Sequence, residues 1–150
     1  GRIVNDSMGR FVADAAIKNM IAVGQSPKKS KVVILGLTFK ENCPDTRNSK
    51  VDDIIKRLNE FEIYPVIVDP WANECDAMHE YGVTLTKLEN IKGADCIIVA
   101  VAHNEFKALK LDDIKKLYRE CADKEKVLLD VKGIYKVEEL NKSGIKYWRL

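Results

Sequence analysis

The chain has 150 residues, of which 46% are hydrophobic and 32% charged, and its formal net charge is +2. This length fits one domain, and the balanced charge excludes a polybasic nucleic-acid-binding arm and an acidic disordered tail. The longest apolar run, from Cys96 to Ala102, is far shorter than the roughly 20 residues that a membrane helix needs. We therefore expect neither nucleic acid nor a membrane as a partner.

The cysteines and the first residues bear on where the protein works and on how much of it is present. No CxxC or CxxH spacing occurs, which argues against a zinc site and against a disulfide framework and fits a reducing, cytoplasmic location. We therefore expect no metal. Because the chain begins with Gly1 and its first methionine is Met8, we interpret it as a piece of a longer protein. The four cysteines are Cys43, Cys75, Cys96 and Cys121.

Two patterns divide the chain. Apolar residues spaced by three and four, beginning at Ile3 and Val4, predict a long helix over residues 1–24 that leads in from the absent part of the protein. A polar connector over 25–31 follows, and an α/β domain is expected over 32–150.

Within 32–150, short β-branched runs alternate with amphipathic segments. Strands are predicted at 32–35, 63–68, 83–85, 96–101, 127–130 and 145–148. Helices are predicted at 49–61, 73–81, 111–118 and 137–141, the first of them capped by Asn48 or Ser49. This alternation implies parallel pairing and right-handed crossovers. We expect a Rossmann-like, doubly wound parallel sheet of about five or six strands, preceded by the long N-terminal helix.

Ligands of such sheets bind beyond the carboxyl ends of the strands, where the strand order reverses. This rule selects four loops, at 37–48, 69–72, 102–106 and 131–135. Their polar side chains are Lys40, Glu41, Asp45, Arg47, Asp69, His103, Asn104 and Lys132.

The first of these loops is unusually long. It has about a dozen residues, against roughly 2–6 in an ordinary strand–helix connection, and long loops in compact domains tend to be functional. Lys40 and Arg47 in this loop, with Lys132 from another strand end, would form a positively charged rim suited to a phosphate-bearing ligand. The alternative is that Lys40 and Arg47 form surface ion pairs with Glu41 and Asp45.

Several other sites are excluded or left open by the residues alone. Only Gly36 follows the first strand, so the GxGxxG dinucleotide fingerprint is absent, and so is a phosphate-binding GxxxxGK[ST] loop. His103 is either a general base or a hydrogen-bonded structural residue. Cys43 has no neighbour that would activate its thiol, and Trp71 either stacks on a ligand or packs under its loop. The residues thus predict a binding surface and no catalytic group.

One segment resembles a family signature. Residues 36–49, GLTFKENCPDTRNS, resemble the motif that opens the C-terminal, UDP-sugar-binding domain of UDP-glucose/GDP-mannose dehydrogenases. Further landmarks follow in the family's order: Asp69-Pro70, Gly93-Ala94-Asp95, the AHNEF run at 102–106, and Asp130-Val131-Lys132-Gly133. The residues of these motifs are most similar to those of the branch that acts on UDP-N-acetylhexosamines.

The resemblance implies an activity for the intact enzyme. Such enzymes oxidise the C6 alcohol of a UDP-sugar to the uronic acid for polysaccharide biosynthesis, with NAD held in an N-terminal domain, a catalytic cysteine upstream, and a central helix that makes a homodimer. None of the four cysteines matches the nucleophile's motif. The chain would therefore be the nucleotide-sugar-binding domain of an NAD-dependent UDP-sugar 6-dehydrogenase, inactive alone.

Residue roles carry over only where the motif matches. Lys40, Lys132 and the backbone of Phe39 would contact the UDP-sugar, and Arg47 would reach across the cleft toward NAD. Two alternatives of other classes remain: a free-standing nucleotide-binding or receiver-like regulatory module, and a protein-interaction domain that uses the first helix. A receiver, however, needs acidic residues where Gly36-Leu37-Thr38 stand.

Overall fold

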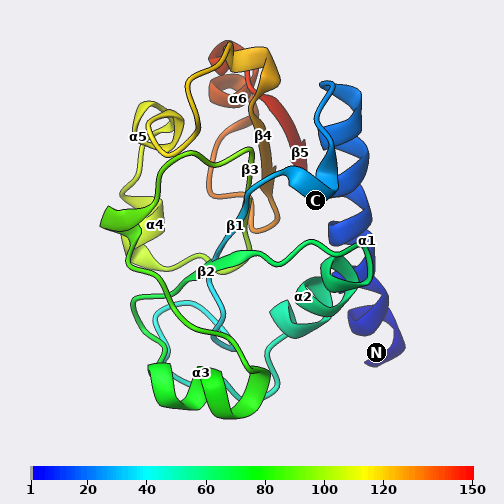
Figure 1. The fold of residues 1–150 in the computed structure, drawn as a ribbon. Coiled ribbons are helices and arrows are strands. Elements are labelled where there is room, and N and C mark those ends of the chain that lie inside the picture. Colours follow the sequence, from blue (N-terminus) through cyan, green and yellow to red (C-terminus); the bar gives the residue numbers. More distant parts are fainter. Residues whose placement is uncertain (1) are drawn as a thin grey trace.

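The computed structural model describes the backbone of residues 2–150 and the side chains from residue 8 onward. It contains a five-stranded, fully parallel sheet in the order β2-β1-β3-β4-β5, flanked by helices (Figure 1). The strands are β1 (Val32–Leu35), β2 (Val66–Val68), β3 (Cys96–Val99), β4 (Val127–Asp130) and β5 (Lys146–Arg149). The predicted doubly wound sheet is therefore confirmed, with five strands.

The helices connect the strands in the expected alternation. They are α1 (Arg2–Ala22), α2 (Val51–Glu60), α3 (Glu74–Tyr81), α4 (Asn104–Lys107), α5 (Leu111–Lys115) and α6 (Val137–Ser143), with short 3-10 turns at Pro27–Lys29, Leu88–Asn90 and Asp123–Glu125. From β1 the chain moves outward to β2 and then returns to the other side of β1 to form β3. The strand order thus reverses between β1 and β3, which is where a ligand is expected. Among residues 2–150, no helix has the length and apolarity to cross a membrane.

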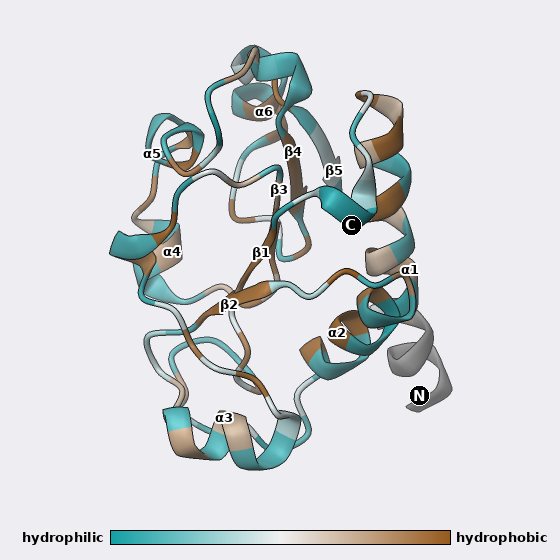
Figure 2. Ribbon diagram, in the orientation of Figure 1, coloured by the Kyte–Doolittle hydropathy of each residue, from teal (hydrophilic) through white to brown (hydrophobic). Residues whose placement is uncertain are grey.

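The central strands are buried on both faces, which explains their unbroken apolar sequences (Figure 2). Val32 and Ile34 of β1 pack in the core under α1 and α2. Val33 and Leu35, pointing the other way, pack in a second core with residues of α4, α5 and α6 such as Phe106. Alternate residues of one strand therefore hold two layers of helices in place.

The long first helix is packed onto the domain. Val12, Ala16 and Met20 are buried in the core that α2 and the sheet share. A Cβ atom on Gly9 would lie 2.4 Å from Cβ of Asp53, so a glycine is needed where α1 crosses α2. The domain itself thus covers most of the predicted apolar stripe, although Phe11 remains 55% exposed. This burial argues against the hypothesis that the first helix serves as a surface for binding another protein. The side chains at 2–7, including Ile3 and Val4, lie outside those described.

Some element boundaries differ from the prediction. Helix α2 begins after Lys50, which is its N-cap, and neither Asn48 nor Ser49 occupies that position. The Ser49 hydroxyl instead accepts a hydrogen bond from the backbone N–H of Val51 at 3.1 Å. The predicted N-cap is wrong because the preference for serine and asparagine at helix starts does not determine at which residue the preceding loop enters the helix.

The structure also differs from the prediction in two further segments. Residues 83–85, predicted as a short strand, make one isolated bridge, between Ile67 and Leu85. Part of the segment 102–106, predicted as a loop, forms the four-residue helix α4. In the connector, the Gln25 side chain donates to the carbonyl oxygens of Asp95 and Glu125 at 3.1 and 3.0 Å, so this polar segment is fixed to the domain.

Candidate functional site

The site lies at the carboxyl edge of the sheet, and Gly36 sets how the long loop leaves β1. Its φ of +111° lies in a region that side-chain-bearing residues avoid. A Cβ atom there would lie 2.5 Å from Cβ of Val101 and 2.8 Å from its backbone nitrogen. The Gly36 N–H donates to the carbonyl oxygen of Val68 at 2.7 Å. The loop therefore starts in close contact with the ends of both β2 and β3.

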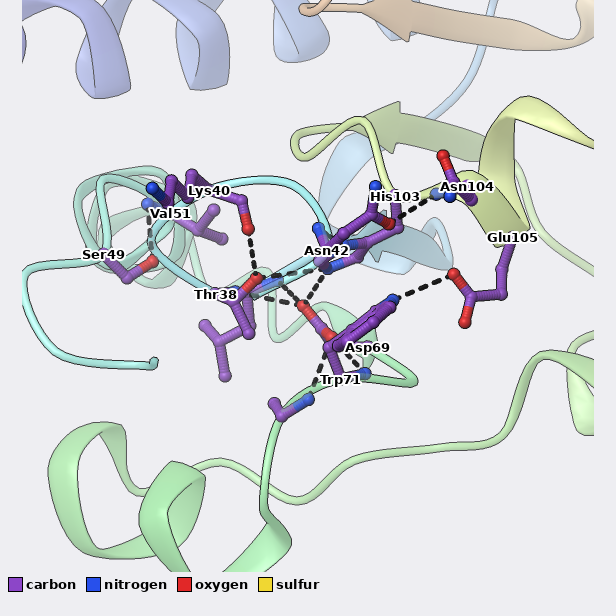
Figure 3. Close-up of polar contacts among 12 residues, drawn as sticks. Thr38, Lys40, Asn42, Ser49, Val51, Asp69, Trp71, His103, Asn104 and Glu105 are labelled. Atoms are coloured by element: carbon purple, nitrogen blue, oxygen red, sulfur yellow. Dashed lines mark hydrogen bonds and ion pairs between the residues drawn. The ribbon is translucent and has the colours of Figure 1, made fainter. Parts of the chain in front are cut away.

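The buried carboxylate of Asp69 holds three loops together (Figure 3). Its Oδ2 atom accepts from the backbone N–H groups of Leu37 and Thr38 at 2.6 and 3.0 Å, and from His103 Nε2 at 2.9 Å. Its Oδ1 atom accepts two backbone N–H groups of its own turn at 2.8 and 3.0 Å. Burial alone would raise the pKa of Asp69, but the hydrogen bonds from His103, Leu37 and Thr38 outweigh it and lower this pKa.

His103 is a structural residue of this cluster. Its side chain is fully buried, and Nδ1 accepts the backbone N–H of Asn42 at 2.9 Å. The proton must therefore be on Nε2, which faces Asp69 Oδ2 and lies 3.1 Å from Thr38 Oγ1. A ring with both nitrogens engaged and no exposed surface cannot reach a substrate. The structural alternative for His103 is confirmed, and the general-base alternative is wrong.

Trp71 belongs to the wall of the same cluster. Its indole stacks on the His103 ring, with ring centroids 6.1 Å apart, and its Nε1 donates to Glu105 Oε1 at 2.9 Å (Figure 3). Trp71 thus packs over the loop junction, although 37% of its surface remains exposed.

The far end of the loop after β1 is held by α3. Thr46 Oγ1 donates to Glu80 Oε2 at 3.0 Å. The Tyr81 hydroxyl donates to the carbonyl oxygen of Thr46 and accepts the Ser49 N–H at 3.1 Å. Burial raises the pKa of Tyr81, so the phenol keeps its proton at neutral pH. The loop is therefore anchored at both of its ends.

The side chains predicted to bind ligand are exposed on this anchored loop. Phe39 is 49% exposed, and its backbone N–H donates to the carbonyl oxygen of Asp45 at 2.7 Å. Lys40 is exposed, and its carbonyl oxygen accepts from Thr38 Oγ1 at 3.1 Å (Figure 3). Among residues 8–150, Lys40 forms no ion pair with Glu41.

Arg47 forms the ion pair that the alternative interpretation expected. Its Nε and Nη2 atoms donate to Oδ1 and Oδ2 of Asp45 at 3.0 and 3.2 Å. The hydrogen bond and charge of Asp45 raise the pKa of Arg47, and those of Arg47 lower the pKa of Asp45. The guanidinium side chain is still 77% exposed, so the pair leaves Arg47 accessible.

Lys132 lies on a separate turn, after β4. It is exposed, and the turn is fixed by the buried Asp130, whose carboxylate accepts the N–H groups of Ile134 and Tyr135 at 3.0 and 2.9 Å. Because β3 separates β1 from β4 and all three strands are parallel, the turn that carries Lys132 and the loop that carries Lys40 and Arg47 leave the same edge of the sheet. The structure thus brings the cations to one edge, on two separate turns.

A separate hollow lies beside β2. It is a cleft of about 840 Å³ over apolar side chains such as Leu88 and Phe106, with acidic residues such as Glu74 and Glu89 at its rim. Phe39, Lys40, Arg47 and Lys132 line neither this cleft nor three smaller hollows of 310, 520 and 530 Å³. The exposed side chains of the cationic rim therefore lie outside these four hollows.

Cys96 is a buried core residue, and burial strongly raises the pKa of its thiol. Within residues 8–150, no three His, Cys, Asp or Glu side chains gather as a metal site would require.

Sequence reasoning missed two anchors, Glu80 and Tyr81. Both lie on α3, more than thirty residues from the loop that they hold, and nothing in their local sequence marks them. The sequence identifies Asp69 as a polar residue at a strand end and as part of the Asp69-Pro70 landmark, and the structure shows that it is also the centre of the junction.

Comparisons with known proteins agree with this arrangement. The profile of the UDP-glucose/GDP-mannose dehydrogenase family, UDP binding domain, matches residues 33–137. The chain is 44% identical over 132 residues to UDP-N-acetyl-D-glucosamine 6-dehydrogenase of Pseudomonas aeruginosa, covering 88% of this chain and 30% of that protein. It is 34% identical over 145 residues to UDP-N-acetyl-D-mannosamine dehydrogenase of Methanococcus maripaludis, covering 97% and 32%.

A solved structure supports the fold. The NDP-N-acetyl-D-galactosaminuronic acid dehydrogenase of Methanosarcina mazei superposes with a TM-score of 0.85 at 24% identity, over 99% of this chain and 30% of that one. The chain thus spans about a third of the length of these relatives. Since the family profile covers most of the sheet together with the anchored loop after β1, the chain belongs to the UDP-glucose/GDP-mannose dehydrogenase family as a UDP binding domain.

Proposed function

We propose that this chain is the nucleotide-sugar-binding domain of an NAD-dependent UDP-sugar 6-dehydrogenase, which oxidises the C6 alcohol of a UDP-N-acetylhexosamine or UDP-glucose to the uronic acid. The observation that carries the proposal is the loop after β1, which is anchored at both ends and presents Lys40 to solvent without an acidic partner among residues 8–150. The relatives named for UDP-N-acetylglucosamine and UDP-N-acetylmannosamine favour a hexosamine.

The chemistry of the ligand suits this edge. The diphosphate of a UDP-sugar is anionic, and Lys40 and Lys132 are exposed on two separate turns that hydrogen bonds fix at this edge. Phe39, which precedes Lys40 and is held by its backbone to Asp45, supplies an exposed aromatic surface and a backbone carbonyl. Binding energy gained at this end of the substrate helps to orient the C6 alcohol at a reacting centre elsewhere.

The remaining parts of the active site are assigned to the rest of the enzyme. We expect the catalytic cysteine, the NAD-binding domain and the dimer contacts of a homodimer to lie outside this chain, so that the chain alone does not turn over substrate. NAD, when bound there, accepts the hydride. Of this chain's residues, Arg47 is the one that the family resemblance assigns to NAD, and its exposed ion pair with Asp45 is of a weak kind that a phosphate can replace.

The test is an NMR titration of the chain with UDP at low salt, which also measures weak binding. Weak binding is expected because an open rim is only part of a site. Lys40→Ala and Lys132→Ala should each weaken UDP binding about three- to tenfold, the loss of one charge-assisted contact. Lys18→Ala, an exposed lysine on α1, is the control and should bind UDP like the wild type. Equal affinities in Lys40→Ala and Lys18→Ala would contradict the proposal.

A further inference from the structure

The hydroxyl group of Tyr81 closes the turn that carries Arg47. The turn runs from Thr46 to Ser49, and in an ordinary β-turn the carbonyl oxygen of the first residue accepts the N–H of the fourth. Here the phenol stands between these two groups: it donates to the carbonyl oxygen of Thr46 and accepts the Ser49 N–H at 3.1 Å. Arg47 and Asn48 are the two central residues. Asn48 has φ +59°, a conformation that asparagine tolerates better than most residues.

A second contact from α3 fixes the first residue of this turn. Thr46 is only 2% exposed, and its hydroxyl donates to Glu80 at 3.0 Å. The helix that supplies both anchors is itself well defined. Asn73 caps its start by accepting the N–H groups of Cys75 and Asp76 at 2.8 and 3.1 Å, and Gly82 ends it in the left-handed conformation. The turn is therefore fastened to a helix that is capped at both of its ends.

Apart from the contacts with α3, the hydrogen bonds of this turn go to the start of α2, where the Val51 N–H donates to the Ser49 hydroxyl, and to its own loop, where the Arg47 N–H donates to Asp45 Oδ1 at 2.9 Å. The Arg47 side chain contacts Asp45, which lies in the same loop and moves with it. The Asp69 cluster holds the opposite end, at Leu37 and Thr38. The contacts of α3 with the backbone on both sides of Arg47 therefore restrain the turn from which the guanidinium projects.

We infer that Tyr81 is a positioning residue, which holds the Arg47 turn so that the guanidinium is presented at the carboxyl edge in one orientation. This inference rests on the proposed function, in which Arg47 contacts NAD in the complete enzyme. Tyr81 itself does not touch the ligand and acts through Arg47. The segment that follows β2 therefore holds the loop after β1 at two points. Asp69 contacts the start of that loop, and Tyr81 contacts its end.

The first experiment tests the bridge in this chain without a ligand. Tyr81→Phe removes only the hydroxyl, and Tyr64→Phe makes the same change at a tyrosine that is 74% exposed. We expect hydrogen exchange of the Ser49 amide to become roughly tenfold faster in Tyr81→Phe, because this amide loses its acceptor. Tyr64→Phe should leave it unchanged. Unchanged exchange at Ser49 in Tyr81→Phe would overturn the bridge.

The second experiment tests the function of the bridge in the full-length enzyme, by a cycle of Tyr81→Phe, Arg47→Ala and the double variant. Tyr81→Phe should raise KM for NAD about three- to tenfold, leaving kcat at saturating NAD unchanged, and the double variant should match Arg47→Ala. A merely structural role would instead lower stability without this dependence on Arg47.

The outcomes separate the two proposals. If Arg47→Ala leaves KM for NAD unchanged, the ligand role of Arg47 is wrong, and the positioning role falls with it. If Arg47→Ala raises KM but Tyr81→Phe does not, or if their effects multiply in the double variant, the proposed function stands and the positioning role is overturned. Tyr64→Phe in the same enzyme should show wild-type kinetics.

Discussion

The carboxyl edge of the sheet has two parts that are built in opposite ways. Beneath the surface, Asp69, His103 and Thr38 form a buried cluster whose polar atoms are paired with one another and with backbone amides. Above it, Lys40 and Arg47 extend into solvent. The buried part fixes where the loop runs, and the exposed part offers charge to a ligand. Stability and binding are therefore expected to respond to different substitutions.

Asp69→Ala should produce the largest loss of stability. It removes a carboxylate that accepts five hydrogen bonds and leaves buried donors unpaired. We expect the free energy of unfolding to fall by about 3–5 kcal/mol in urea denaturation. Asp112→Ala, at an exposed position on α5, is the control and should change it by less than about 0.5 kcal/mol. A loss no larger than in the control would show that the cluster does not stabilise the fold.

Gly36→Ala should have the next largest effect, because it strains the point where the loop leaves β1. The new methyl group would meet Val101 at 2.5 Å, and φ is +111°. Overpacking and backbone strain together should cost about 2–4 kcal/mol of unfolding free energy. Gly24→Ala separates the backbone strain from the overpacking. Gly24 has φ +86°, but a Cβ atom added there would have no atom within 4 Å. This substitution should cost about 1 kcal/mol, and an equal loss in both variants would exclude the contact with Val101.

The buried cluster also predicts a dependence of stability on pH. The pKa of Asp69 is lower in the folded protein than its ordinary value of 3.8. The unfolded chain therefore binds the proton more tightly, and the stabilisation from this carboxylate is complete above pH 3.8 and is lost as pH falls through the folded pKa. Urea denaturation in that acid range should show a shallower pH slope in Asp69→Asn than in the wild type. Asp112→Asn should retain the wild-type slope, and identical slopes in all three proteins would contradict the assignment.

The contrast between buried and exposed parts also explains what the sequence could predict. The strands β1, β3 and β4 were located well because strands buried on both faces are continuous apolar runs. Helix α4 was missed because four residues are too few to show a helical period. The segment 83–85 has strand-like residues, but it makes only one bridge to the sheet, a matter of tertiary contact.

In the candidate site, too, the exposed residues could be predicted from the sequence and the buried anchors could not. The length of the loop after β1 and its cations were visible in the sequence, and the parallel fold correctly placed Lys132 on the same edge. The anchors were not visible. His103 and Tyr81 act through contacts across more than thirty residues, and a buried histidine or tyrosine has the same local sequence whether or not it holds a loop. Only the packed structure shows which polar residues are committed to the framework.

Arg47→Ala should have the smallest effect on stability, although it is expected to impair the complete enzyme. The guanidinium side chain is 77% exposed, and its ion pair with Asp45 is a local contact within the loop. Such pairs contribute little because solvent screens them and two long side chains must be ordered. We therefore expect the urea midpoint of this chain to be unchanged. A marked drop in the urea midpoint would show that the Arg47–Asp45 pair helps to stabilise the loop. The distinction between a buried cluster that stabilises the fold and exposed cations that bind ligand would then not hold for Arg47.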